Sequence, residues 1–583
     1  MKKYKLNVVS MCSIPFLIIG SGVAPVGAQS ISDAARQAQI EVARQQQLQQ
    51  LQQQQNQAQT LNKSDFDFKI QRTDKSPVKK ALDELEFVLN GIDVDGDHIF
   101  DEVETDKSFE KYLGKKTTLS ELTEGVENLE ERYRQAGYFL SKVYIPPQTL
   151  EKGILKIVVI EGYINKINVE GGSDEMQAKV KEILKPLIDK KPLDLQAVEG
   201  AMLVLNSFPG YSVSSVLRQG SEPNSSEMFI NVGQNPNNHM ASINNNSGYS
   251  TGPLGVSFNG TMNHLLGRDN QVSYGYNGAV GINSVDEFNR LMSITAKYAE
   301  PIGRSGLVGS ISIVESKAKP GASLAPLGIE TNGQNISTRL SYPLYKAHGN
   351  SLSVDSGVAF NRSTTTSGGN PLTFDKSTVF DINLAWTNNR ILNGSNVMNF
   401  TVAKGLPGGN SLNTGDATAS TIGFSPLFTK FAFNWIRIQP IVTSWSASFG
   451  MNGQYTGDNL LTADSIVFGG ASVGRGYDSG AIAGDKGLGA SLEIRKDLTY
   501  RVPYAAGPVQ IFAYCDYATV ATNSNATTGT LESSKSLKSY GIGARTTFPK
   551  GTMELQYAVA DAPLYSADPR ANPRILFLGN YFF

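Results

Sequence analysis

Five carboxylates stand close together in residues 93–104, DVDGDHIFDEVE, at a spacing that could hold a metal ion. An EF-hand calcium loop takes its oxygen ligands from positions 1, 3, 5, 9 and 12 of twelve residues. The residues at these positions are Asp93, Asp95, Asp97, Asp101 and Glu104. The spacing therefore indicates a calcium site, and a calcium sensor is the first function to weigh.

The same stretch departs from a calcium loop at its sharpest turn. Position 6 needs Gly, whereas His98 stands there and Gly96 lies two places earlier. Asp-Gly is also turn chemistry, and Asp97 is able to cap a helix that begins near Ile99. Asp101 would then lie at the positive N-terminal end of that helix. We therefore expect a turn between a strand and a helix, with weak calcium binding as the alternative.

Other reactive residues are scarce. The two cysteines are Cys12 and Cys515, and the four histidines are His98, His239, His264 and His348. The sequence contains neither a Walker A phosphate loop nor a GxSxG nucleophile motif. A disulfide framework, a zinc site and a catalytic constellation are therefore not expected. The 52 Lys and Arg residues balance 53 Asp and Glu residues, which argues against a nucleic-acid partner.

The first 28 residues have the pattern of a secretory signal peptide. Lys2, Lys3 and Lys5 make a basic start, Ile14–Gly20 is apolar, and Val26–Ala28 resembles a cleavage site. A transmembrane anchor is the alternative, but the apolar stretch is too short and is interrupted by Gly and Pro. No later run reaches the ~18 apolar residues of a membrane helix. We therefore expect an exported chain that is either soluble or a β-barrel.

Two polar segments follow this leader. Residues 29–60 are rich in Ala, Gln and Arg and contain neither Gly nor Pro, which favours helix. Their apolar positions, Ile40, Val42, Leu48 and Leu51, form too thin a face for a standard core. The alternatives are a disordered Gln-rich leader and a polar helix that lies inside a wet cavity. A polar linker is expected over residues 61–80.

Residues 81–233 contain a degenerate internal repeat of about 75 residues. In each half, apolar side chains recur at helical spacing, over 115–138 and over 190–211, and the segment ends in Gly-Tyr. The predicted N-caps are Thr118 and Asp194, and Glu121 would complete a capping box with Thr118.

The flanking segments give each half the same order of elements. The predicted strands are 85–94, 154–162, 163–171 and 227–233, and the remaining predicted helices are 99–113 and 176–188. Each half therefore has the order β-α-α-β-β. We expect two small α+β domains, over 81–162 and 163–235.

The pattern changes at about residue 240. Period-2 segments of about ten residues, such as 271–278, 553–560 and 574–583, alternate with Gly, Asn, Ser and Asp turns. This alternation, with aromatic residues near the strand ends, is typical of a transmembrane β-barrel. A soluble sandwich is the alternative, but the length allows about 16 strands, too many for a common sandwich. We expect a mainly β chain in which residues 236–583 form an antiparallel barrel.

These segments also resemble a known family. Residues 119–162, LSELTEGVENLEERYRQAGYFLSKVYIPPQTLEKGILKIVVIEG, resemble the first POTRA domain of TpsB proteins, the outer-membrane transporters of two-partner secretion. Residues 244–260 resemble the start of that family's first barrel strand, and the chain ends in the terminal aromatic residue Phe583. The resemblance implies the outer membrane of a Gram-negative bacterium, with periplasmic POTRA domains and lipid around the barrel. It also implies that the helix within 29–60 plugs the pore at rest.

The most specific match is FGGASVGRGYDSG, residues 468–480. The family carries VRG(F/Y) in its sixth extracellular loop, and Arg475, Gly476 and Tyr477 match that motif. Gly474 stands where the family has Val, so a looser turn is expected. The resemblance implies that this loop, near residues 468–485, folds into the barrel and sets its Arg against an acid on the inner wall. Residues 512–520, FAYCDYATV, provide that acid as Asp516.

Physical reasoning alone leaves the environment of Arg475 open. An arginine at an exposed loop needs no partner, whereas one inside a narrow lumen needs a carboxylate that matches its planar fork. Breaking such a buried pair would leave an uncompensated charge, at a cost of about 3–5 kcal/mol. With the resemblance added, we predict a lock between loop and barrel formed by Arg475, Gly476, Tyr477 and Asp516.

The resemblance implies a translocator rather than an enzyme. The protein would capture an unfolded exoprotein through its POTRA domains and pass it through the barrel without nucleotide hydrolysis or a cofactor. The expected client is a large secreted exoprotein of the filamentous haemagglutinin or haemolysin type. Two alternatives stay open: a barrel-assembly factor of the same superfamily, and a plain porin with a periplasmic module.

Overall fold

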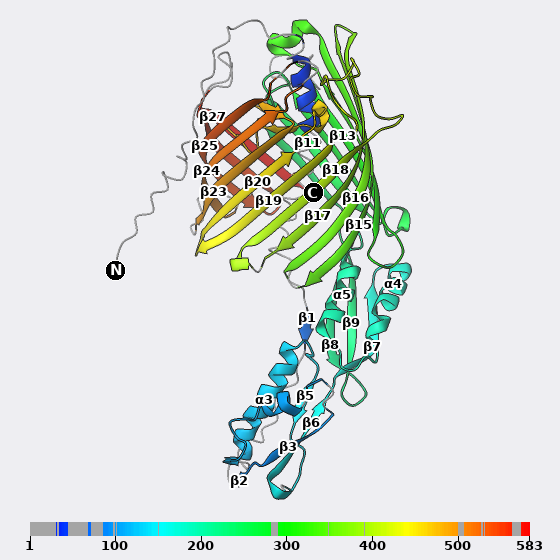
Figure 1. Ribbon diagram of the computed structural model, residues 1–583, viewed down its shortest axis with the longest axis vertical. Helices are drawn as coiled ribbons and strands as arrows, with labels where there is room; N and C mark the ends of the chain where they lie inside the picture. The colour runs from blue at the N-terminus through cyan, green and yellow to red at the C-terminus, as the bar shows by residue number, and fades with distance from the viewer. Residues whose placement is uncertain are drawn as a thin grey trace, which may run out of the picture.

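The computed structural model describes residues 31, 34–44, 68–70, 86–96, 99–100, 102–149, 151–280, 290–347, 349–389, 391–498, 507–525, 529, 531–562 and 573–583. The predicted signal peptide, residues 1–28, lies outside them. Two small α+β domains stand below a β-barrel, and the helical residues 34–44 lie at the opposite mouth of the barrel (Figure 1). Among the described residues, no helix combines the length and hydrophobicity needed to cross a membrane.

The first α+β domain has two helices beside two small sheets. Its elements are β2 (Glu86–Val88), β3 (Gly91–Asp95), α2 (Glu102–Asp106), β4 (Lys116–Thr118), α3 (Leu119–Gln135), β5 (Lys142–Tyr144), η2 (Glu151–Gly153) and β6 (Ile154–Ile160). The larger sheet has the order β3-β6-β5, and β2 pairs with β4. The predicted apolar face of α3 is confirmed, because Leu122, Val126, Leu129 and Tyr133 are buried.

The strand predicted over 85–94 is in fact two strands. The chain leaves the small sheet at Leu89, whose N–H donates to Lys115 O, and Asn90 N–H donates to Gly153 O. β3 then runs parallel to β6. One continuous apolar pattern therefore spans strands of two different sheets. The backbone N–H of Leu89 bonds next to β4, whereas the backbone N–H of Asn90 bonds next to β6.

The two helix starts predicted from capping residues are confirmed. Thr118 Oγ1 accepts from Glu121 N–H at 3.3 Å, and Glu121 Oε2 accepts from Thr118 N–H at 3.0 Å. Asp194 accepts from Gln196 N–H at 2.6 Å at the start of α5. Both caps satisfy backbone donors that the first helical turn leaves free.

The helix predicted over 99–113 is much shorter, because it is only α2 followed by turns. The turns bring Phe109 into the core against Gly125 of α3. A Cβ added at Gly125 would lie 2.4 Å from the Phe109 ring. Tertiary packing of this aromatic residue therefore overrides the local helix preference.

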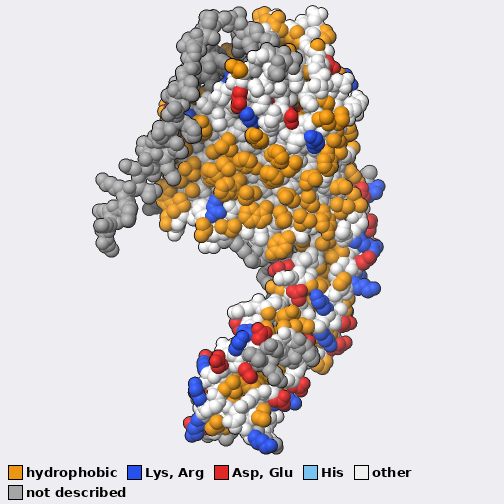
Figure 2. All heavy atoms as spheres, in the orientation of Figure 1, with side chains coloured by type: hydrophobic (Ala, Val, Ile, Leu, Met, Phe, Trp, Pro, Cys, Tyr) orange, Lys and Arg blue, Asp and Glu red, His pale blue; other side chains and the backbone are white. Residues whose placement is uncertain are grey.

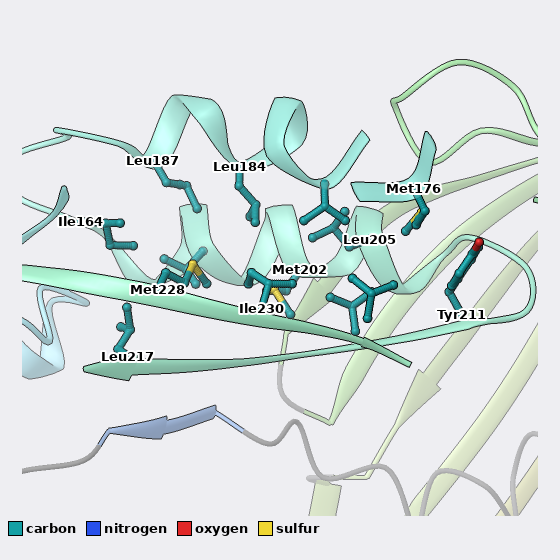
Figure 3. Close-up of a cluster of buried hydrophobic side chains, with 14 of the residues drawn as sticks. Ile164, Met176, Leu184, Leu187, Met202, Leu205, Tyr211, Leu217, Met228 and Ile230 are labelled. Atoms are coloured by element: carbon teal, nitrogen blue, oxygen red, sulfur yellow. The ribbon is translucent and has the colours of Figure 1, made fainter. Parts of the chain in front are cut away.

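The second α+β domain has the predicted β-α-α-β-β order. Its elements are β7 (Tyr163–Gly171), α4 (Asp174–Leu184), η3 (Lys185–Leu187), α5 (Leu195–Asn206), β8 (Tyr211–Gln219) and β9 (Ser225–Gln234). The two helices cover one face of the sheet. Figure 3 shows the resulting core, to which Met176, Leu184, Met202, Leu205, Met228 and Ile230 belong.

A strand lies inside the predicted linker 61–80. β1 (Phe68–Ile70) pairs in parallel with β8 and extends the second sheet to the order β1-β8-β9-β7. The linker prediction is therefore wrong at these three residues. The edge of β8 has free backbone N–H and C=O groups that an extended segment can pair with. This pairing depends on tertiary structure, so the composition of residues 61–80 does not reveal it.

Sixteen of the remaining described strands close into an antiparallel barrel. They are β10 (Asn238–Asn244), β11 (Leu254–Asn263), β12 (Gln271–Val280), β13 (Leu291–Pro301), β14 (Val308–Ala318), β15 (Ile329–Ala347), β16 (Asn350–Ser367), β17 (Asn370–Asn388), β18 (Ser395–Leu406), β19 (Thr429–Val442), β20 (Trp445–Tyr455), β23 (Lys486–Leu498), β24 (Val509–Thr522), β25 (Ser533–Phe548), β26 (Gly551–Ala560) and β27 (Arg574–Phe582). Short 3-10 turns are η4 (Leu265–Gly267), η6 (Ala322–Leu327), η7 (Ile391–Asn393) and η8 (Thr462–Asp464). β10 pairs with β27 to close the ring.

The outer surface of the barrel carries an apolar band. Figure 2 shows hydrophobic side chains gathered across the middle of the barrel on the face in view. Exposed members include Leu340, Tyr342, Ile382, Leu384 and Phe400, while polar side chains alternate with them on the inner face. Such a band is suited to lipid, so the predicted transmembrane barrel is confirmed.

The second α+β domain docks on the turns below the barrel. Asp269, between β11 and β12, accepts from Tyr211 Oη at 2.6 Å and lies 2.9 Å from Lys179 Nζ. Burial raises the pKa of Asp269, but the Tyr211 and Lys179 contacts outweigh it and hold this pKa below its usual value. The ring of His264 contacts the ring of Tyr211 in a tilted arrangement, with centroids 4.3 Å apart. These contacts orient the domain against the barrel.

Candidate functional site: a locked loop and a helix in the barrel mouth

Residues 468–485 lie inside the barrel. The strands at the two ends of this loop, β21 (Ile466–Phe468) and β22 (Ile482–Gly484), pair with each other. The loop packs on the inner wall in one apolar cluster, which contains Ile466, Phe468, Val473, Tyr477, Ile482, Ala518, Val520, Leu537 and Ala560. Apolar contact therefore holds the loop in the lumen before any charge is counted.

Arg475 and Asp516 form a bidentate pair at the centre of this contact. Arg475 Nε donates to Asp516 Oδ2 at 3.1 Å, and Nη2 donates to Oδ1 at 2.9 Å. The Arg475 guanidinium also lies over the Tyr514 ring, with Cζ 3.4 Å from its centroid. The exposed fractions are 6% for Arg475 and 1% for Asp516. The desolvated guanidinium therefore has the matched partner that its burial requires.

The backbone geometry on both sides of Arg475 requires glycine. Gly474 has φ of +90°, and its N–H donates to Asp516 Oδ2 at 3.1 Å. A Cβ at Gly476 would lie 2.6 Å from the backbone N of Ala560. The turn at Gly474 is thus held by Asp516. A β-branched residue would be strained at this positive φ.

Tyr477 completes the predicted group. Its hydroxyl donates to Ala562 O at 2.8 Å, and its ring is 5% exposed. The structure thus brings all four predicted residues, Arg475, Gly476, Tyr477 and Asp516, to one place on the inner wall.

Sequence reasoning missed Glu493, which connects the loop to two more arginines. Glu493 accepts from Arg475 Nη1 at 2.9 Å, from Arg495 Nε at 2.7 Å and from Arg545 Nη2 at 2.7 Å. Arg545 also lies 3.0 Å from Glu554. Three arginines therefore face three carboxylates. The signal was present in β23, where Ser491, Glu493 and Arg495 alternate as polar residues on the lumen face.

The helical residues 34–44 occupy the opposite side of the barrel mouth. Gln39 Nε2 donates to Thr365 Oγ1 at 3.0 Å and to Thr373 Oγ1 at 2.6 Å. The alanine side of the helix packs on the ends of neighbouring strands in one cluster, which contains Ala34, Ala35, Ala38, Val42, Ala279, Leu291, Ala318, Leu324 and Ile329. Residues 34–44 are therefore helical, as one of the two alternatives from the sequence predicted. Of the apolar positions expected from sequence, Ile40 and Val42 are buried, and Val42 belongs to the same cluster as the alanines. Leu48 and Leu51 lie outside the described residues.

The other side of this helix contacts the locked loop. Ser479 Oγ donates to Glu41 Oε2 at 3.0 Å, and Glu41 is 1% exposed. Arg44 lies 3.9 Å from Glu41. Ser479 is four residues beyond Arg475. The same loop therefore contacts both the helix and the barrel wall that carries Asp516 and Glu493.

A separate apolar cluster lies among the extracellular loops. Leu412, Phe424, Phe428, Leu460 and Leu461 pack together with the upper part of β17 in one apolar cluster. Asp375 is 2% exposed there and accepts from Ser420 N–H at 2.7 Å. Lys430 pairs with Asp464 instead, at 3.1 Å.

The proposed calcium ligands are only partly described. Asp93 and Asp95 lie on β3 and Glu104 lies on α2, whereas Asp97 and Asp101 fall outside the described residues. Asp95 lies 3.6 Å from Lys156, and Glu104 lies 3.9 Å from Arg132. Among the described residues, no group of three His, Cys, Asp or Glu side chains is arranged to hold a metal. Calcium binding stays a prediction.

A closed barrel with an inward loop, an arginine lock and a β-α-α-β-β domain docked below it defines a POTRA-and-barrel protein of the outer membrane. Comparison with known families gives two matches. A POTRA domain of ShlB type matches residues 87–162. The family described as haemolysin secretion/activation protein ShlB/FhaC/HecB matches residues 226–546, more than half of the chain.

The chain therefore belongs to the ShlB/FhaC/HecB family of haemolysin secretion/activation proteins. The resemblance to TpsB proteins is therefore confirmed. The predicted outer-membrane location and the predicted periplasmic location of the POTRA domains are confirmed as well. Members of this family work with large secreted exoproteins in two-partner secretion.

Relatives and solved structures agree with this assignment. The heme/hemopexin transporter protein HuxB of Haemophilus influenzae (strain 86-028NP) is 23% identical over 71% of this chain and 73% of its own length. The outer membrane transporter CdiB-2 of Burkholderia pseudomallei (strain 1026b) is 23% identical over 68% of this chain and 66% of its own length.

The fold matches that of CdiB from Escherichia coli, with a TM-score of 0.69 and 20% identity over 94% of this chain and 99% of that chain. CdiB from Acinetobacter baumannii gives 0.62 and 16% identity, over 96% of this chain and all of that chain.

Proposed function

We propose that this protein captures an unfolded exoprotein in the periplasm and passes it through the barrel to the cell surface or the medium. The observation that carries this proposal is the occupied mouth. Helix 34–44 fills it through contacts that are largely small, polar or hydrogen-bonded. Such a segment loses little on rehydration, which suits a removable plug rather than a permanent core.

Capture would use the edge of the first POTRA sheet. β5 pairs with β6 on one side, and the described residues give it no strand partner on the other. An extended client segment can add there through backbone hydrogen bonds that carry little sequence information. The corresponding edge of the second domain, β8, is covered by β1. The first domain is therefore the better site for initial contact.

Direction would come from the client rather than from a nucleotide. An exoprotein that folds outside can no longer re-enter the pore, so folding makes transport irreversible by mass action. In this proposal the protein is a conduit without a catalytic step or cofactor. Its client is a large exoprotein of the filamentous haemagglutinin or haemolysin type.

Deletion of the first POTRA domain, residues 81–162, tests capture. The deletion keeps the second domain and its Asp269 contact with the barrel. Co-expression with a large exoprotein that the full chain exports should then give an inserted barrel and no exoprotein in the medium. Export at the parental level would reject capture by this domain. Loss of other barrels from the outer membrane would favour a barrel-assembly factor, and uptake of small solutes alone would favour a porin.

A further inference from the structure

The wall beneath helix 34–44 is chemically distinct from the rest of the mouth. We call its residues the mouth seat: Ala279, Leu291, Ala318, Leu324, Ile329, Thr365 and Thr373. They come from the upper ends of β12 to β17 and from the loop before β15. Without the helix, this apolar strip with two hydroxyls would face the lumen.

The mouth seat accepts small side chains at close range. Ala34, Ala35 and Ala38 are at most 4% exposed against it. Gly333 lies beside this contact, where an added Cβ would be 2.5 Å from Val42 Cγ1. The wall is therefore shaped for a backbone that approaches closely, and a bulky side chain would need the wall to move.

The two hydroxyls recognise an amide. Thr365 Oγ1 and Thr373 Oγ1 both accept from Gln39 Nε2, and Thr365 Oγ1 lies 2.9 Å from Thr331 Oγ1. A hydroxyl can rotate to donate or accept, so this pair can serve either end of an Asn or Gln side chain. None of the seven seat residues carries a charge.

The charged residues of the helix lie on its other side. Glu41 contacts Ser479 of the locked loop, and an added Cβ at Gly470 would lie 2.5 Å from Arg44 Nη2. The loop itself is fixed to the far wall by Arg475. When the helix leaves, the freed space is bounded by the mouth seat on one side and by the loop on the other.

We propose that the mouth seat is a binding site for the exported chain, and that helix 34–44 is an intramolecular stand-in for it. The ligand class is an uncharged segment of small apolar and amide side chains, namely Gly, Ala, Val, Asn and Gln. This inference rests on the proposed export function. A charged side chain on the seat would lose its hydration without a partner, so charged segments bind weakly.

Replacement of residues 34–44 within the full chain tests this recognition. One variant carries an 11-residue sequence of Ala, Val, Asn and Gln unrelated in order to the native one, and a second carries Ser, Glu and Lys. Pore conductance in planar lipid bilayers reports how often the mouth is closed. The amide variant should match the parent within about twofold, and the charged variant should stay open, because tethering gives both the same effective concentration.

Substitution of the two hydroxyls isolates the chemistry of the seat. Thr365→Val with Thr373→Val should reduce the closed-to-open ratio about tenfold in both the parent and the amide variant, through two lost hydrogen bonds. Thr338→Val on the outer face of β15 is the matched control and should change nothing. Equal closure by the charged variant, or no effect of the two valines, would overturn the proposal.

A free peptide provides an independent measurement if a replaced helix fails to enter the barrel. An uncharged 11-residue peptide of Ala, Val, Asn and Gln should block a chain that lacks residues 31–44, and the two valines should weaken that block about tenfold. Block of equal strength by a peptide of Ser, Glu and Lys would contradict the inference. Neither measurement contains an exoprotein, so failure here leaves capture and export to be judged by the POTRA deletion.

Discussion

The wall formed by β23 to β26 and the wall formed by β12 to β17 both hold a segment in the lumen, but with different side chains. The first grips residues 468–485 through Arg475, Asp516 and Glu493, all buried. The second holds helix 34–44 through alanine contacts and the amide of Gln39. Paired buried charges are costly to separate, whereas neutral contacts exchange readily with water. In our proposal, the first wall holds a durable lock and the second holds a releasable plug.

Arg475→Ala should have the largest effect on export, because it removes the loop residue that pairs with Asp516 and Glu493. Asp516 and Glu493 would stay buried with less compensation, at about 3–5 kcal/mol. We expect weak export while the barrel is still inserted, measured as exoprotein in the medium and as heat-modifiable migration of the barrel. Arg134→Ala, in an exposed pair on α3, is the control and should change export little. Unchanged export in Arg475→Ala would show that the lock is dispensable.

Glu493→Gln should be the next most disruptive change on the charged wall. It leaves Arg475, Arg495 and Arg545 close together with one carboxylate fewer, at about 2–4 kcal/mol. We expect a lower unfolding temperature of the barrel, followed by heat-modifiable migration. Glu315→Gln is a control on β14. If the two substitutions lower the temperature equally, Glu493 is not the hub of this network.

Gln39→Leu should affect the neutral wall without weakening the barrel. Two hydrogen bonds to Thr365 and Thr373 are lost, a net change of about 1–3 kcal/mol. We expect more frequent pore openings in planar bilayers and an unchanged unfolding temperature. A matched change of unfolding temperature would mean that the helix is part of the permanent core, and the contrast between the walls would fail.

Several features were readable from local sequence. The caps at Thr118 and Asp194 and the buried face of α3 follow from short-range hydrogen bonding and helical period. Where prediction failed, a distant partner decided the outcome. β2 gives way to β3 because Asn90 N–H donates to Gly153 O beside β6, and Phe68–Ile70 form a strand because β8 lies alongside. Neither partner lies within the span that a periodicity argument examines.

The order of parts, the period-2 strands and the GRGY motif could be read from the sequence, because they depend on spacing along the chain. The groups that meet in the lumen are set by the closed barrel and its folded loop. Glu493 joins Arg475, and Ser479 joins Glu41 across more than 400 positions of sequence. Barrel closure and loop folding bring such residues together, and a buried charge then takes whichever partner the closed space supplies.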